Sequence, residues 1–110
     1  MSSEYVSIKE EVLKKLEANL PEIRERFGVE TIGIFGSVSR GEDTADSDID
    51  VLYLFRENKG SMSTIIPLID YLQNLFGRRV DLVSINYISP LIEQYVKSDA
   101  IIFGTKEAAA

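Results

Sequence analysis

The N-terminal part of the chain has the hydrophobic pattern of an amphipathic helix. From Ile8 onward, apolar residues recur at steps of three and four positions. They are Ile8, Val12, Leu13, Leu16, Leu20, Ile23 and Phe27, and this spacing places them on one side of a helix. Ser7 could cap the helix and Gly28 could end it. Because Pro21 lacks an amide hydrogen and clashes with the preceding turn, we expect either a kink or two helices, the second opened by Pro21.

Four further segments have the apolar and β-branched residues typical of strands. They are Thr31–Phe35, Asp48–Phe55, Arg79–Ser84 and Ala100–Phe103. The apolar run within Asp48–Phe55 is the strongest of them and predicts a buried central strand. In Arg79–Ser84 the alternation of a strand puts Asp81 on the same face as Val83.

Two more helices are predicted downstream. Apolar residues from Ile65 to Phe76 follow helical spacing, and Pro67 fits only near the start of that helix. Ser89–Pro90 combines a capping hydroxyl with a ring that pre-sets the first helical dihedral angle. The resulting order of helices and strands predicts an α/β fold, with a mixed sheet of about four strands flanked by helices.

Composition limits the organisation and the location of the protein. The 110 residues, of which 45% are hydrophobic, suit a single domain over residues 1–110. Residues 1–7 and 105–110 are expected to be frayed tails. No apolar run approaches the ~20 residues that span a bilayer, and the N-terminus lacks the pattern of a secretory signal. We therefore expect a cytoplasmic protein that does not contact membranes.

Charge and missing residue types narrow the chemistry further. The chain contains no cysteine and no histidine, which excludes disulfides, thiolate nucleophiles and imidazole bases. Any catalytic base is therefore expected to be Asp or Glu. The balance of 18 acidic and 12 basic residues gives a net charge of -6, which repels phosphate backbones and argues against direct binding of nucleic acid.

Three aspartates are the candidate metal ligands. Asp48 and Asp50 open a strand two residues apart, so both side chains project from one face with a Cα spacing of about 7 Å. If the strand of Asp81 lies beside them, a third carboxylate joins the pair. Three like charges in one site repel strongly unless a divalent ion neutralises them, and carboxylate oxygens suit Mg²⁺. Taken alone, Asp48 could merely start a strand.

Gly36 and Ser37 follow the first predicted strand, at the point where the chain turns. Taken alone, Gly-Ser is a common turn. Backbone donors and a hydroxyl at such a turn also suit a phosphate group, which the missing side chain of Gly36 would allow to approach closely. Together with metal-binding carboxylates, the pair predicts chemistry on a nucleoside triphosphate with release of pyrophosphate.

The stretch GIFGSVSRGEDTADSDIDVLYLF resembles the core motif of the DNA polymerase β-like nucleotidyltransferases, and within them of the minimal nucleotidyltransferase (MNT) group. In that motif Gly-Ser is followed by Asp-x-Asp, and here residues 38–47 separate the two. Arg40–Gly41, Ser47–Asp48 and the later Asp81 also match. The likeness extends from about Val29 through Phe103 in element order. All three aspartates are present, as an active member requires.

The resemblance implies roles for these residues. Asp48 and Asp50 would ligate two Mg²⁺ ions, for which Mn²⁺ could substitute. Asp81 would bind the catalytic ion and accept the proton of the attacking hydroxyl. The substrate would be ATP.

The resemblance also implies nucleotide-binding residues. Gly36 and Ser37 would hold the β- and γ-phosphates. Arg40 would either contact a phosphate or be a solvated loop cation, and Ser47 would brace the loop before Asp48 rather than touch the nucleotide. Larger relatives have an additional helical or RNA-binding domain that selects the acceptor, so their acceptor specificity does not carry over to this chain.

Within the MNT group, stand-alone domains resemble antitoxins encoded beside a HEPN ribonuclease, which they block by adenylylating a tyrosine. The resemblance therefore implies AMP transfer to a tyrosine of a HEPN toxin. Two alternatives stay open, namely a non-catalytic module that masks a partner's active site and transfer to a small molecule. An exposed apolar patch would mark a homodimer or partner interface. Its candidate residues are Ile65, Ile66, Tyr71, Ile92 and Tyr95.

Overall fold

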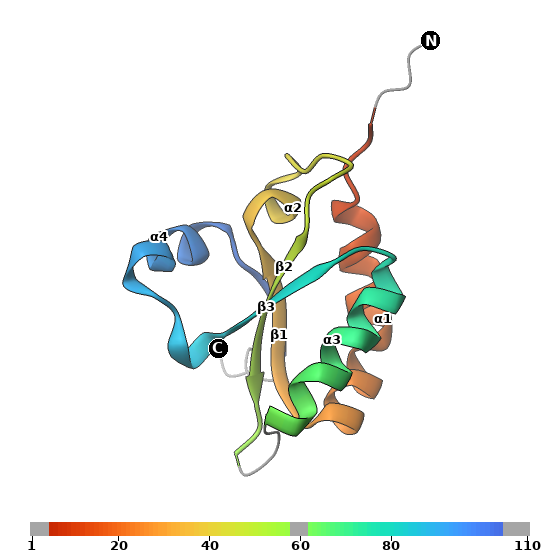
Figure 1. Cartoon of the computed structure of the whole chain (residues 1–110), viewed down its shortest axis with the longest axis vertical. Coiled ribbons are helices and arrows are strands. Elements are labelled where there is room, and N and C mark those ends of the chain that lie inside the picture. Colours follow the sequence, from red (N-terminus) through yellow and green to blue (C-terminus); the bar gives the residue numbers. More distant parts are fainter. Residues whose placement is uncertain (1–4, 58–61, 105–110) are drawn as a thin grey trace.

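The computed structural model describes residues 5–57 and 62–104, which form a four-stranded sheet with helices on both faces (Figure 1). The major elements follow in the predicted order, and the α/β fold class is confirmed. The bounds are α1 Lys9–Phe27, β1 Val29–Phe35, α2 Gly36–Arg40, β2 Ile49–Phe55, α3 Met62–Phe76, β3 Val80–Ser84, the 3₁₀ helix η1 Ile85–Tyr87, α4 Pro90–Asp99 and β4 Ile101–Gly104.

The sheet is mixed, with the strand order β3-β2-β1-β4. β1 runs antiparallel to both β2 and β4, whereas β2 and β3 are parallel. A parallel pair needs a crossover connection, and α3 supplies it. The observed strand bounds differ from the predicted ones by one or two residues.

α1 and α3 cover one face of the sheet, where they bury the larger core (Figure 1). α1 is continuous through Pro21, so the alternative of two separate helices was wrong. Leu16 and Ile23, on either side of Pro21, are both fully buried. Their packing against the sheet offsets the backbone hydrogen bond that Pro21 removes. Pro67 lies in the second turn of α3, close to the expected position.

The opposite face of the sheet is covered more thinly, by α4 (Figure 1). The buried residues there are Phe35, Leu52 and Val96. Pro90 is the first helical residue, and Ser89 Oγ accepts a hydrogen bond of 3.2 Å from the Leu91 amide. The predicted start of this helix is therefore confirmed.

Part of the segment expected to be a frayed tail is bonded into the fold. The hydroxyl groups of Tyr5 and Ser7 both donate hydrogen bonds to the carboxylate of Asp43. Ser7 Oγ also accepts a hydrogen bond from the Lys9 amide, at 3.1 Å. Residues 1–4 and 105–110, which make up the rest of the expected tails, lie outside the described residues.

The apolar residues considered for an interface differ in exposure. Ile66 is 64% exposed, whereas Ile65, Tyr71 and Ile92 are partly buried, and the side chain of Tyr95 lies outside the described residues. Two apolar residues outside this candidate set, Tyr87 and Leu91, are more exposed than Ile66, at 85% and 84%. Across residues 5–57 and 62–104, no helix has both the length and the apolar character needed to cross a membrane.

Candidate active site

The parallel pairing of β2 with β3 brings two of the candidate aspartates side by side. Asp50 is the direct register partner of Asp81, and Asp48 immediately precedes β2. Ile49 and Val80 belong to the larger core beneath α1 and α3. Because side chains alternate along a strand, Asp50 and Asp81 face the other side of the sheet. Asp81 thus lies beside the pair, as the metal-site hypothesis requires.

The three carboxylates influence one another electrostatically. Burial, followed by the negative charges of Asp81 and Asp48, raises the pKa of Asp50 to about 6, while the charge of Arg40 acts in the opposite direction. The side chain of Asp48 is 47% exposed, and its Oδ1 lies 3.9 Å from Arg79 Nε. Asp81 is also exposed. Asp50 is therefore the least exposed of the three acids.

The donor set fits a hard divalent cation, although the carboxylate groups do not yet converge. In the part of the chain that the structure describes, no three acidic side chains are gathered closely enough to hold a metal ion together. The backbone nevertheless places Asp50 and Asp81 side by side, since paired residues of neighbouring strands are about 5 Å apart. Mutual repulsion keeps charged carboxylates apart, and a cation would draw them together.

Gly36 lies directly against the central carboxylate. It opens α2 with a φ of 78°, and a β-carbon at this position would overlap Asp50 Oδ2. The hydroxyl of the buried Ser39 donates a 3.0 Å hydrogen bond to the Gly36 carbonyl and stabilises the turn. The structure therefore brings Gly36, and with it the adjacent Ser37, next to Asp50.

Arg40 is engaged by acidic side chains rather than free in solvent. Its Nη1 lies 2.6 Å from Asp99 Oδ2 at the end of α4, and its Nε lies 2.9 Å from Glu42 Oε1. Hydrogen bonds to Glu42 and Asp99 raise the pKa of the Arg40 guanidinium. A phosphate contact by Arg40 would compete with these two acids or use the remaining N–H groups of the guanidinium.

The loop between α2 and β2 contains Ser47 and two functional candidates that sequence reasoning missed. Ser47 Oγ accepts a 2.9 Å hydrogen bond from the Thr44 amide, which is the geometry of a loop brace. Asp43 is buried, and Arg78 donates hydrogen bonds to the carbonyls of Thr44 and Ser47. No local signal could have identified Asp43 and Arg78, because their partners are distant in sequence and both residues stand in polar runs.

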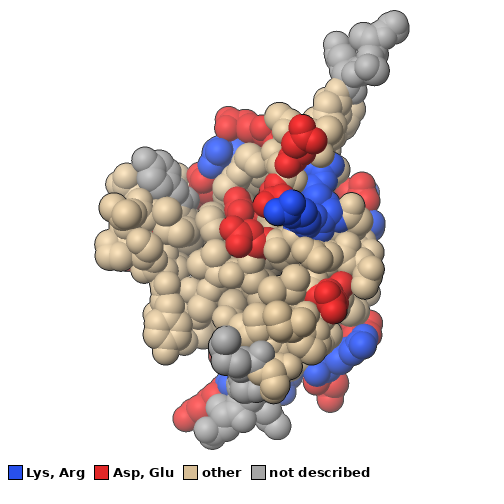
Figure 2. All heavy atoms as spheres, in the orientation of Figure 1, with Lys and Arg blue, Asp and Glu red and all other residues tan. Residues whose placement is uncertain are grey.

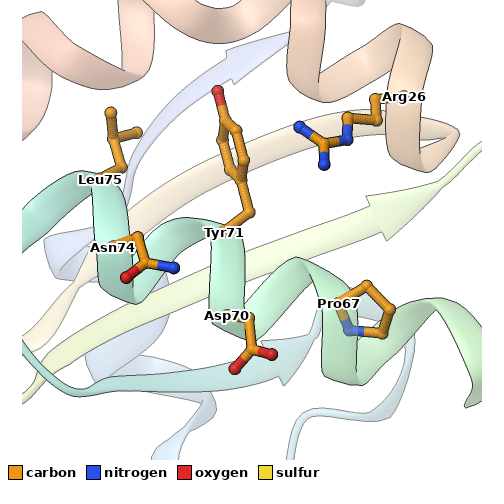
Figure 3. A pocket seen from close by; sticks show the side chains of 6 residues that line it. All are labelled: Arg26, Pro67, Asp70, Tyr71, Asn74 and Leu75. Carbon is orange, nitrogen blue, oxygen red and sulfur yellow. The ribbon is translucent and has the colours of Figure 1, made fainter.

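A separate hollow of about 500 Å³ lies away from these residues. It is formed by side chains from α1 and α3, as Figure 3 shows. Its lining consists of Arg26, Pro67, Asp70, Tyr71, Asn74 and Leu75. The hollow contains none of the candidate residues, and its helices cover the face of the sheet opposite Asp50. The hollow is therefore separate from the candidate active site at the aspartates.

Comparison with known proteins identifies the family of the chain. The family model of the Nucleotidyltransferase domain matches residues 10–103, which include all three aspartates and the Gly36 turn. The chain belongs to the nucleotidyltransferase family. It is thus a nucleotidyltransferase enzyme, and the resemblance stated from the motif is confirmed.

Two archaeal relatives of this nucleotidyltransferase are similar over most of its length. The protein adenylyltransferase MntA of Thermococcus cleftensis is 51% identical over 74 residues, which cover 67% of this chain and 74% of the relative. A Methanocaldococcus jannaschii protein assigned as a protein adenylyltransferase is 37% identical over 93 residues, covering 83% and 90%.

Solved structures of nucleotidyltransferases have the same fold. A chain assigned as a minimal nucleotidyltransferase is 35% identical with a TM-score of 0.70, and the match covers 84% of this chain and 93% of the other. A chain from the crystal structure of a toxin-antitoxin with AMP-PNP is 26% identical with a TM-score of 0.62, covering 91% and 76%.

Proposed function

We propose that this nucleotidyltransferase transfers AMP from ATP to a tyrosine hydroxyl of a HEPN toxin and thereby acts as an antitoxin. The observation that carries the proposal is the register pairing of Asp50 with Asp81, beside the Gly36 turn. Support comes from the 51% identical relative named for protein adenylylation and from the likeness to a toxin-antitoxin chain crystallised with AMP-PNP. The choice of a HEPN toxin and its tyrosine follows the family resemblance.

In the proposed reaction, the acceptor oxygen attacks the α-phosphorus of ATP. A new oxygen–phosphorus bond forms, the bond to the bridging oxygen of the β-phosphate breaks, and pyrophosphate leaves. A tyrosine hydroxyl has a pKa of about 10, so it needs activation, and Asp81 would accept its proton. Asp48 and Asp50 would ligate both metal ions and Asp81 one of them. Bound Mg²⁺, or Mn²⁺ in its place, would supply Lewis-acid polarisation of the phosphoryl group.

Residues of α2 and the following loop would bind the nucleotide. The Gly36 turn and the Ser37 hydroxyl would hold the β- and γ-phosphates, since backbone amides at such a turn suit an anion. Arg40 would exchange Asp99 for a phosphate. Ser47 would keep the loop in shape through its bond to Thr44.

The decisive experiment mixes the protein with its cognate HEPN partner, ATP and Mg²⁺ and measures the intact mass of the partner. The partner should gain the mass of one or more AMP groups, and Asp81→Asn should stop this gain. Asp46→Asn is the matched control, because it removes one charge from an exposed aspartate close to the site. An unmodified partner in the presence of wild-type protein would contradict the proposal.

The same experiment separates catalysis from simple masking of the partner. A masking module would neutralise the toxin without nucleotide, and Asp81→Asn would not affect it. We expect neutralisation to require both ATP and Asp81, measured as protection of RNA from the toxin. Neutralisation by the Asp81→Asn protein without nucleotide would favour the masking alternative.

A further inference from the structure

Asp43 is a buried carboxylate at the centre of a hydrogen-bond network outside the aspartate site. It accepts hydrogen bonds from the hydroxyls of Tyr5 and Ser7 and, at 3.2 Å, from the Ile8 amide. Its side chain has no solvent exposure, and Arg78 Nη1 lies 4.0 Å from its Oδ2. The network thus joins the loop of residues 41–48 to the start of α1.

Arg78 holds the same loop from the other side. Its Nη1 donates hydrogen bonds to the Thr44 carbonyl at 2.9 Å and to the Ser47 carbonyl at 3.3 Å. The Arg78 guanidinium also lies over the ring of Tyr5, with Cζ 5.7 Å from the ring centroid. Because Arg78 stands immediately before Arg79 and β3, it connects the strand that carries Asp81 with the loop that carries Asp48.

The position of Asp48 depends on the loop that precedes it as well as on the sheet that follows it. Asp48 lies outside β2, and about half of its side chain is exposed. Among the described residues, its one ion pair is with Arg79, at 3.9 Å. The Ile49 amide bonds to the Arg79 carbonyl at 2.9 Å and fixes the residue that follows. The residue that precedes, Ser47, is fixed by Arg78 through its carbonyl.

We propose that Asp43 and Arg78 are positioning residues, which clamp the loop of residues 41–48 so that Asp48 is held beside Asp50 and Asp81. The clamp acts through backbone carbonyls and the start of α1, and neither residue contacts the nucleotide. The role of the clamp in metal binding rests on the proposed function, in which Asp48 is a metal ligand. It also gives Tyr5 and Ser7 a role, because their hydroxyls complete the bonding of Asp43.

The test compares Arg78→Gln, Arg78→Lys and Asp43→Asn with the wild type. Thermal melts at a fixed ATP concentration would give the Mg²⁺ concentration for half of the maximal stabilisation. Arg78→Gln and Asp43→Asn should raise this concentration about 10-fold or more, as is usual when a residue that orients a metal ligand is lost. Arg78→Lys should recover part of the loss, since an ammonium can still donate to a carbonyl.

Two controls separate positioning from general stability. Ile23→Val should lower the melting temperature, because it removes a methyl group from the core on the far face of the sheet, without changing the Mg²⁺ requirement. Asp46→Asn removes a charge from the loop of residues 41–48 and should also leave the Mg²⁺ requirement unchanged. A shift in Arg78→Gln no larger than in Ile23→Val would overturn the proposal. If Arg78→Gln does not fold, Tyr5→Phe provides the milder test, with a smaller shift in the same direction.

Hydrogen exchange in metal-free protein distinguishes failure of the clamp from failure of the proposed function. Peptides that cover residues 41–48 should exchange faster in Arg78→Gln than in the wild type, and at the wild-type rate in Ile23→Val. A wild-type protein that gains no stability from Mg²⁺ and ATP would contradict the proposed function. Unchanged exchange in Arg78→Gln would contradict the clamp itself.

Discussion

Gly36 combines a left-handed backbone with a contact that leaves no room for a side chain. Its φ is 78°, and a β-carbon would overlap Asp50 Oδ2. Gly77 has a similar φ of 71° but no atom within 4 Å of the place where a β-carbon would lie. We expect Gly77→Ala to cost only the left-handed backbone energy, about 1–2 kcal/mol, with AMP transfer intact. Gly36→Ala should cost at least as much and lower kcat about 100-fold, because Asp50 must move.

Chemical denaturation and a single-turnover transfer assay would measure this pair of glycine variants. The comparison isolates the contact with Asp50, because the backbone cost is common to both positions. Equal transfer rates for Gly36→Ala and Gly77→Ala would contradict the role assigned to the turn.

Asp50 should make the metal-free protein less stable as the pH rises. Burial and the neighbouring Asp81 and Asp48 raise its pKa from 3.8 to about 6, so the folded state holds a proton that the unfolded chain has already released. The free energy of unfolding therefore falls as the pH rises through this window. At pH values above about 6, Asp50→Asn should therefore stabilise the protein. After allowance for solvent screening, the gain should be about 1 kcal/mol, or roughly 4–8 °C in melting temperature.

Melts in the presence of a chelator at about pH 5 and pH 7.5 would test this linkage. The gain from Asp50→Asn should appear at the higher pH, while nucleotide transfer is lost. Asp46→Asn removes a charge outside the strands and serves as the control. A variant less stable than the wild type at the higher pH would show that the charge of Asp50 does not strain the site.

At the scale of elements, an ion pair connects the short helix of the glycine turn to α4. Asp99 Oδ2 lies 2.6 Å from Arg40 Nη1, and the Asp99 side chain is only 11% exposed. Glu93 and Lys97 form a pair within α4 at 3.3 Å, with both side chains largely exposed. We expect Asp99→Asn to lower the free energy of unfolding by up to about 1 kcal/mol and Glu93→Gln by less than about 0.5 kcal/mol. Urea unfolding of the two variants would measure the difference, and equal losses would contradict a role for Asp99 in docking α4.

The elements themselves were largely predictable because their signals are local. The spacing of apolar residues located the helices and strands, and Ser89–Pro90 gave the start of α4. Asp-x-Asp and Gly-Ser pointed to two segments that the structure brings into contact at Gly36 and Asp50. The effect of Pro21 was overestimated, because the burial of Leu16 and Ile23 on either side of it comes from tertiary packing, which a local rule cannot include.

Contacts between distant segments could not be predicted in the same way. Arg40 matched a motif position, yet one of its two acidic partners is Asp99, 59 residues away. Asp43 is bonded to Tyr5, 38 residues away, so a residue in a polar run is buried, and residues 5–7 of the expected tail are bonded to the fold. The pairing of Asp50 with Asp81 depends on which strands are neighbours in the sheet. The sequence did not determine this order, so the pairing could be stated only as a condition.

For the whole molecule, the distribution of charge bears on whether the acceptor is a nucleic acid. The chain carries 18 acidic and 12 basic residues. Several basic side chains are paired with acids, among them Lys15 with Glu11 and Arg26 with Glu22. On the face seen in Figure 2, the basic side chains adjoin acidic ones and form no continuous strip.

This distribution predicts that the protein does not bind RNA or DNA by itself. Proteins bind polynucleotides largely through Lys and Arg side chains, which neutralise phosphates and release their counterions. Here the net charge of -6 repels the phosphate backbone. Fluorescence anisotropy with a labelled single-stranded RNA at physiological salt should therefore give a Kd weaker than about 100 µM. Tighter binding that weakens steeply with added salt would contradict the prediction and would reopen a nucleic-acid acceptor. If binding is absent, the acceptor is not a polynucleotide held through its phosphates, which leaves a protein or a small molecule as the source of the hydroxyl.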